Sequence, residues 1–96
     1  MAVTRIGEFQ AQEGKAERLR ALLSAALPAI RSSKGCRSCR LLQSQSDPAR
    51  IMVIEVWESV EAHQASVKAI PPEMVEKARS LLAAAPKAGF YIEQAT

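Results

Sequence analysis

A run of seven residues, IMVIEVW at positions 51–57, constrains the fold of this chain more than any other feature. Six of the seven are apolar and several are β-branched, which is typical of a strand that is covered on both faces. Side chains alternate along a strand, so the odd-numbered positions share one face and the even-numbered positions share the other. The odd face is interrupted by one charged residue, Glu55, close to the only tryptophan, Trp57. We therefore expect a polar site on this face, within an apolar setting.

The hydrophobic period changes after this run from two to about 3.6, and Ser59 supplies a side-chain oxygen that can cap a new helix. Four residues at helical spacing share one face of this helix, which begins polar and ends apolar. If the apolar end packs on the sheet, the polar end is carried inward, beside Trp57. We expect a pocket at this junction, lined by His63 and Ser66, with Val67 and Ile70 as the apolar end.

The totals predict a single domain spanning residues 1–96. No run approaches the roughly 18 apolar residues that a membrane span needs, so we expect no membrane partner. The N-terminal residues MAVTRIGEF show neither an apolar signal core nor a cleavage site, and a cytoplasmic location is expected. A chain of this length buries only about 60 to 65% of its unfolded surface, a shortage that association with a second copy would relieve.

A net charge of +3 raises the question of nucleic acid binding. Lysines and arginines are spread among acidic residues, and only the segment 31–40 is locally basic. With four aromatic residues in the whole chain, there is no platform on which bases could stack. We expect no nucleic acid partner.

Cys36 and Cys39 form a C-x-x-C pair, which invites a redox or zinc interpretation. Their setting favours the opening of a strand after Gly35, where the two side chains would point to opposite faces. Three strand steps separate their Cα atoms by about 10 Å, too far for a disulfide. No second C-x-x-C or histidine pair completes a zinc site. We expect two ordinary thiols and no metal.

The remaining segments predict further strands and helices. Pro28 should bend or end the first helix near Leu27, and Pro86 should stop the last helix. The turn at Asp47 and Pro48 implies an antiparallel hairpin. The expected strands are 3–12, 36–45, 50–57 and 87–94. The first expected helix lies in the segment 13–33, and the others begin near Ser59 and Pro72.

Read in order, the elements are β-α-β-β-α-(α)-β, the pattern of a ferredoxin-like, split βαβ α+β sandwich. A four-stranded antiparallel sheet would then carry all its helices on one face. The other face would be left uncovered, although the two-faced apolarity of residues 51–57 requires a cover. The sheet of a twin subunit is the simplest cover, so we expect a homodimer.

Several stretches together resemble the antibiotic biosynthesis monooxygenase family of dimeric α+β barrels. The most specific is E-x-W-x-S-x-E-A, from Glu55 to Ala62. The others are Gly35-Cys36, the Asp47-Pro48 hairpin and the closing segment 86–90, and the resemblance extends over about residues 3–93. It implies a dimeric barrel and, in some members, oxidation of electron-rich phenols or quinols by O2 without a metal or flavin cofactor.

The resemblance also implies roles for individual residues. Trp57 matches the tryptophan at the strand end that lines the family's pocket, and Glu55 matches the acidic residue two positions before it. Many members place a histidine nine positions beyond the tryptophan. Here that position is Ser66, and the only histidine is His63.

Cofactor-free oxygenation needs a base that removes a proton from a phenol, and His63 is the only side chain suited to this at its ordinary pKa. The alternative is a half-buried structural histidine. Trp57 is interpreted as pocket wall rather than core alone. Glu55 could orient His63 or pair with an arginine across the hairpin, and we favour Arg40. Tyr91 could hydrogen-bond a ligand or lie at the rim.

Two functions follow from different classes. One is a cofactor-independent monooxygenase that acts with O2 on a small phenolic or quinol substrate. The other is a non-catalytic dimeric module that binds a small apolar ligand.

Overall fold

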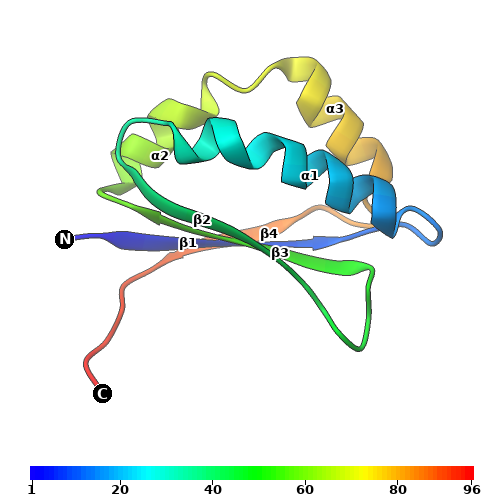
Figure 1. Ribbon diagram of the computed structural model, residues 1–96, viewed down its shortest axis with the longest axis horizontal. Coiled ribbons are helices and arrows are strands. Elements are labelled where there is room, and N and C mark those ends of the chain that lie inside the picture. The colour runs from blue at the N-terminus through cyan, green and yellow to red at the C-terminus, as the bar shows by residue number, and fades with distance from the viewer.

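The computed structural model describes residues 1–96 and contains seven elements in the expected order. The four strands form one antiparallel sheet in the order β2-β3-β1-β4. Figure 1 shows the three helices on one face of this sheet, which confirms the ferredoxin-like α+β fold. None of the helices is long and apolar enough to cross a bilayer. The elements are β1 (Val3–Gln10), α1 (Ala16–Arg31), β2 (Cys36–Gln43), β3 (Arg50–Trp57), α2 (Val60–Val67), α3 (Pro72–Leu81) and β4 (Lys87–Tyr91).

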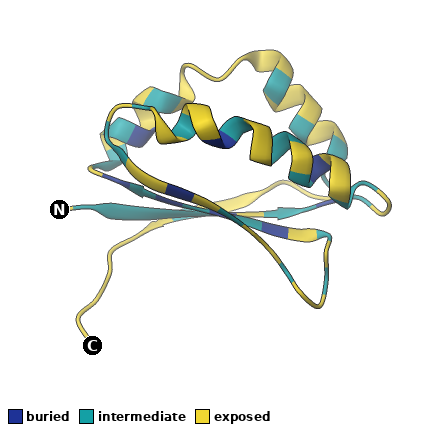
Figure 2. Ribbon diagram, in the orientation of Figure 1, coloured by how far each residue is buried: buried dark blue, intermediate teal, exposed yellow.

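The strand β3 lies inside the sheet, between β2 and β1. Its odd-numbered residues from Ile51 to Trp57 are all buried beneath the helices, and the even-numbered residues between them are only half-buried (Figure 2). The expected alternation of faces is therefore confirmed. Glu55 lies on the covered face, so its carboxylate must find partners within the protein.

The helix α1 packs on the covered face through two buried leucines. Leu19 packs with Ala11 and Ile51, whereas Leu27, two turns later, belongs to a second cluster with Val53. Burying a leucine side chain contributes about 1.5 to 3 kcal/mol, so these two anchors hold the helix across the middle of the sheet.

Of the two outcomes expected at Pro28, an end of the helix near Leu27 is wrong, because α1 continues to Arg31 with Pro28 in its last turn. A proline there removes one backbone hydrogen bond. Tertiary contacts offset that loss. Ile30 packs on the cluster around Leu27, and Arg31 Nε donates a hydrogen bond of 3.1 Å to the carbonyl of Cys39.

Gly35 joins α1 to β2 and also lets α2 approach the sheet. Its φ of +87° is a left-handed conformation that favours glycine. A Cβ added at this position would lie 2.7 Å from the Cβ of Ala62, which is a clash. The Glu58 N–H donates to the Gly35 carbonyl at 2.8 Å. The start of α2 is thus fixed against the start of β2.

The helix α3 ends at Leu81, before the expected stop at Pro86. The chain leaves the helix early because it pairs with the end of β1. The Ala83 N–H donates to the Gln10 carbonyl at 2.8 Å, and the Gln12 N–H donates to the Leu81 carbonyl at 2.9 Å. The strands β1, β2 and β4 likewise end two or three residues before their expected ends.

The cap of α2 is formed as predicted. Ser59 has an extended backbone, with φ −159° and ψ 162°, and its Oγ accepts a hydrogen bond of 3.1 Å from the Ala62 N–H. The helix is only eight residues long, so its first turn contributes a large share of its stability.

Replacing Ser59 with alanine should lower the free energy of unfolding by about 1 kcal/mol, because an amide at the start of α2 loses its partner. Ser59→Asp restores an acceptor at the same position and should recover most of that loss. The measurement is the midpoint of urea unfolding. Equal midpoints for Ser59→Ala and the wild type would contradict a stabilising cap.

Candidate active site

A cavity of about 780 Å³ lies between the sheet and the helix layer. Residues of β1, β3 and all three helices line it, together with the segment that joins α3 to β4. Most of its lining is apolar, which is typical of a site for a small organic molecule. Its polar and charged lining residues are Arg5, Glu55, His63, Ser66 and Arg79.

His63 projects from α2 toward the sheet and is 8% exposed. Its ring meets Trp57 edge-on, with the centroids 5.5 Å apart, and meets Phe90 of β4 in the same manner at 5.3 Å. The Nδ1 atom is shielded from solvent and has no hydrogen-bond partner within the chain. The imidazole is thus oriented by two aromatic rings, with no protein group to fix its proton.

Burial lowers the pKa of His63 from its ordinary value of 6.5, and the positive charge of Arg5 lowers it further. The negative charge of Glu55 acts in the opposite direction without cancelling the shift. His63 is therefore mostly neutral at pH 7. A neutral imidazole is the form that accepts a proton, as a general base must.

Glu55 lies on the sheet below His63 with its carboxylate bound on both sides. Its Oε1 accepts a hydrogen bond of 2.8 Å from the indole Nε1 of Trp57, and its Oε2 lies 3.4 Å from Nη1 of Arg5 on β1. The Glu55 side chain is 6% exposed, whereas that of Arg5 is 24% exposed. The pair therefore joins a buried anion to a cation at the cavity surface.

The prediction that Glu55 pairs with Arg40 is wrong. In the register of β2 and β3, Arg40 stands opposite Ile54, and so lies on the helix-free face of the sheet. Cys39 occupies the position opposite Glu55 on β2, and Arg5 occupies it on β1. An arginine does pair with this carboxylate, but it comes from the other neighbouring strand.

Ser66 lies one turn beyond His63 and lines the cavity. Its Oγ donates a hydrogen bond of 2.7 Å to the His63 carbonyl, so the hydroxyl proton is used within α2. The expectation that the apolar end of this helix packs on the sheet is wrong. Val67 and Ile70 are exposed and border the cavity, because α2 ends at Val67 before it can follow the sheet further.

The other two predicted site residues lie outside the cavity lining. Trp57 is fully buried and supports Glu55 and His63 from behind. Tyr91 stands opposite Thr4 in the sheet, on the face that lacks helices, and is 54% exposed. The structure brings Trp57, Glu55, His63 and Ser66 together, and it separates Tyr91 from them.

Two residues that contact this group were not predicted as site residues, namely Arg5 and Phe90. The sequence carries a signal for the first. Strand alternation places Arg5 on the same face as Gly7 and Phe9, where a charge among small and apolar residues is unusual. Phe90 has no such signal, because its contact with His63 depends on where the edge strand pairs.

The expectation that Cys36 and Cys39 point to opposite faces is also wrong. A β-bulge between Cys36 and Ser38 adds a residue to β2, so both cysteines stand opposite residues of the covered face. Burial, together with the nearby charge of Glu55, raises the pKa of Cys39 to about 11. Such a thiol is a poor nucleophile at neutral pH. That both thiols remain reduced and free of metal stays a prediction for mass spectrometry of the untreated protein.

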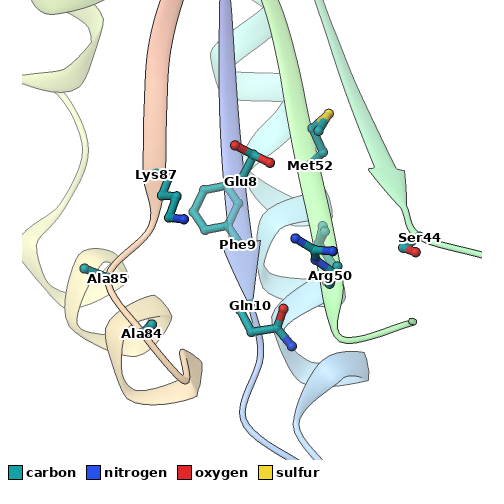
Figure 3. Close-up of a pocket in the computed structure, with 10 residues that line it drawn as sticks. Glu8, Phe9, Gln10, Ser44, Arg50, Met52, Ala84, Ala85 and Lys87 are labelled. Atoms are coloured by element: carbon teal, nitrogen blue, oxygen red, sulfur yellow. The ribbon is translucent and has the colours of Figure 1, made fainter. Parts of the chain in front are cut away.

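A second depression of about 450 Å³ lies at the Gln10 end of the sheet. Figure 3 shows Glu8, Arg50, Met52 and Lys87 on the side of the sheet that faces away from α1. These are one carboxylate, two cations and a thioether, with no histidine among them. The depression therefore lacks the imidazole that lines the larger cavity.

The lowered pKa of His63 should make stability depend on pH. The unfolded chain binds the imidazole proton more readily than the folded chain, so this contribution is complete above about pH 6.5 and is lost as the pH falls through the folded-state pKa. The loss should not exceed about 1.4 kcal/mol per pH unit. Urea unfolding between about pH 7.5 and pH 5.5 measures it. His63→Gln, which cannot titrate, should lose less stability over the same interval, and parallel losses in both proteins would contradict the assignment.

Solved structures show the same fold over nearly the whole chain. Rv0793 from Mycobacterium tuberculosis is 22% identical, with a TM-score of 0.86, and 100% of this chain and 98% of that chain are covered. PA3566 from Pseudomonas aeruginosa is 25% identical, with a TM-score of 0.84 and coverage of 98% and 95%. SnoaB, a cofactor-independent oxygenase from Streptomyces nogalater, is 17% identical, with a TM-score of 0.81 and coverage of 99% and 95%.

No curated protein sequence matches the chain significantly. The family assignment therefore comes from the sequence pattern of the domain itself. Residues 2–84 match the family described as antibiotic biosynthesis monooxygenase, which is most of the chain, and the protein belongs to this family.

Proposed function

We propose that this protein is a cofactor-independent monooxygenase that oxidises a small phenol or quinol with O2. The observation that carries the proposal is His63, a buried imidazole whose pKa is lowered by burial, on the wall of an apolar cavity. The fold shared with SnoaB, described as a cofactor-independent oxygenase, supports the same reaction class.

The reaction begins with transfer of the phenolic proton to His63. The O–H bond breaks, an N–H bond forms on the imidazole, and the electron pair stays on the substrate oxygen. The electron-rich phenolate then passes an electron to O2, and the two radicals combine through a new C–O bond to give a peroxide anion. The imidazolium returns its proton to this anion, which becomes a hydroperoxide, and His63 is neutral again. Loss of water from the hydroperoxide, with the hydrogen of the oxidised ring carbon, breaks the O–O bond and gives a quinone. One oxygen atom enters the product, the other leaves as water, and the substrate supplies all the electrons.

Glu55 has a supporting role in this scheme. It does not reach the proton itself, because its carboxylate is bound by Trp57 and Arg5. Its negative charge favours the protonated form of His63, so it stabilises the imidazolium that the first step creates. Burial and, second to it, the charge of Arg5 lower the pKa of the imidazole, so both favour its neutral form before a substrate binds.

A second candidate function is a non-catalytic module that binds a small apolar ligand. It is favoured by Ser66, which stands where the family resemblance places a histidine in many members. The Ser66 hydroxyl donates to the carbonyl of its own helix, and it offers no second base to the cavity. The apolar lining would serve such a ligand equally well.

We also propose that a second copy of the chain covers the helix-free face of the sheet. Met52, Ile54 and Val56 line this face along β3, and no element of the same chain packs over them. In Figure 1 the face lies open below the sheet, opposite the helices. An obligate interface of this kind buries on the order of 2,000 Å² or more.

Replacing His63 with alanine should lower turnover of a quinol by about 10² to 10⁴-fold, with a modest change in binding, because a general base is removed. Oxygen uptake with a panel of quinols measures this. Ser66→Ala is the matched control, since it alters the same wall without removing a base, and it should retain most activity. Turnover by His63→Ala at the wild-type rate would contradict the role of His63.

The same panel separates the two functions. If no quinol consumes oxygen while apolar ligands still raise the melting temperature, the binding module is the correct function. If a quinol is oxidised in protein freed of metal by chelation and of flavin by dialysis, the oxygenase is correct.

Replacing Ile54 with aspartate should disrupt folding and assembly together, because it places a charge at the centre of the proposed interface. Light scattering should show a dimer for the wild type and a monomer or aggregate for the variant. Ala21→Asp, on an exposed position of α1, is the control and should remain dimeric. A stable wild-type monomer at micromolar concentration would contradict the proposal.

A further inference from the structure

Arg5 carries most of its hydrogen-bond donors unused into the cavity. A guanidinium has five N–H donors, and the only hydrogen bond of the Arg5 side chain runs from Nη1 to Oε2 of Glu55 at 3.4 Å, near the upper limit for such a bond. Arg79, the other arginine of the lining, differs in its surroundings. Its side chain is 71% exposed and lies largely in bulk solvent, whereas that of Arg5 is 24% exposed and meets solvent at the cavity wall.

The conformation of the Arg5 side chain places its charge on the cavity floor. Arg5 stands in register between Glu55 and Phe90, and its side chain extends along β1 toward Gly7. A Cβ added to Gly7 would lie 3.5 Å from Nη1 of Arg5 and 3.4 Å from the ring of Phe9. The guanidinium therefore occupies the space that a side chain at position 7 would fill, and it lines the cavity there.

The surroundings of this cation favour an anionic ligand atom. Glu55 offers the Arg5 guanidinium only one carboxylate oxygen, because the other accepts a hydrogen bond of 2.8 Å from the Trp57 indole. The remaining lining near the floor is apolar, so charge interactions are weakly screened there. A planar guanidinium binds an anionic oxygen through charge-assisted hydrogen bonds, which are about twice as strong as neutral ones.

We propose that Arg5 makes the cavity selective for ligands that combine an apolar ring with one anionic oxygen, which the guanidinium binds. The inference rests on the proposed function only in taking this cavity as the ligand site. In the proposed reaction, the anionic oxygen is that of the phenolate left when His63 takes the proton. The N–H groups of Arg5 donate hydrogen bonds to this oxygen and stabilise its negative charge. A ligand that is already anionic, such as an aromatic carboxylate, uses the same contact.

The charge of Arg5 also reaches His63, where it lowers the pKa of the imidazole. An anionic oxygen bound at Arg5 would offset that charge and make His63 easier to protonate. The two residues therefore act in sequence on one ligand, with the base removing a proton and the arginine retaining the anion.

The test is a comparison of two ligands of nearly equal shape, naphthalene carboxylate and naphthalene carboxamide, by titration calorimetry at neutral pH under argon. The wild type should bind the carboxylate about 10 to 100-fold more tightly, the usual range for a charge-assisted hydrogen bond. The double variant Arg5→Gln/Glu55→Gln should lose this preference and still bind the carboxamide. It removes both members of the pair, so no buried charge is left unpaired, and the new amide oxygen at position 55 can still accept from Trp57.

Arg79→Gln is the matched control, because it removes an arginine from the same lining and should keep the preference. Equal affinities for the two ligands in the wild type, or a preference that survives in the double variant, would overturn the proposal. So would a loss of preference in Arg79→Gln as large as that in the double variant. This binding measurement does not involve O2. If no quinol in the panel were oxidised, the oxygenase would be rejected, but the selectivity for an anionic oxygen would still be tested independently.

Discussion

Glu55 puts a carboxylate on the covered face of the central strand, where an unpaired charge would cost several kcal/mol. Two partners prevent that cost, the indole N–H of Trp57 and the guanidinium of Arg5. Trp57 lies on β3 and Arg5 lies on β1. The hydrogen bonds of the Glu55 carboxylate therefore also hold these two side chains in place on the sheet below the cavity. His63 then packs edge-on against the indole, so the same interaction also orients the imidazole.

The cavity exists because the helix layer does not fill the space above the sheet. Only α1 anchors to the sheet through buried leucines. The helix α2 ends at Val67, and α3 has no buried residue. Their apolar side chains border the open space instead of closing it. A domain of 96 residues with so small a core has a small free energy of unfolding. Burial of the other face of the sheet would therefore add substantially to its stability.

The arrangement of charges suits a reaction that separates charge. The imidazole of His63 lies near a carboxylate that favours its protonated form and a guanidinium that opposes it. Burial and the guanidinium dominate, so the pKa of the imidazole is lowered. In the proposed reaction, the imidazolium would face Glu55 and the phenolate would face Arg5, so each new charge would have a partner of opposite sign. Such preorganised groups lower the barrier because they need little rearrangement as the charge develops.

The features that the sequence determined by itself are those that depend on neighbouring residues. Alternation along residues 51–57 predicted which side chains of β3 share a face, and Ser59 predicted the start of α2. The order of elements and the resemblance predicted the fold. Helical spacing placed His63 and Ser66 on one face of α2, although the apolar end that was to carry them inward is exposed. Each of these rests on a local period or cap, and the chain carries that information within a few residues.

The features that only the tertiary structure decided depend on which segments lie side by side. Arg5 replaced Arg40 as the partner of Glu55 because β3 pairs with β1 as well as β2, and because a bulge sets Cys39 opposite the carboxylate. Pairing with the end of β1 also ended α3 before Pro86. Tyr91 lies away from the cavity because the register of the edge strand turns its side chain to the other face. A shift of one residue in a strand reverses every side chain, and only contacts between distant segments fix that register.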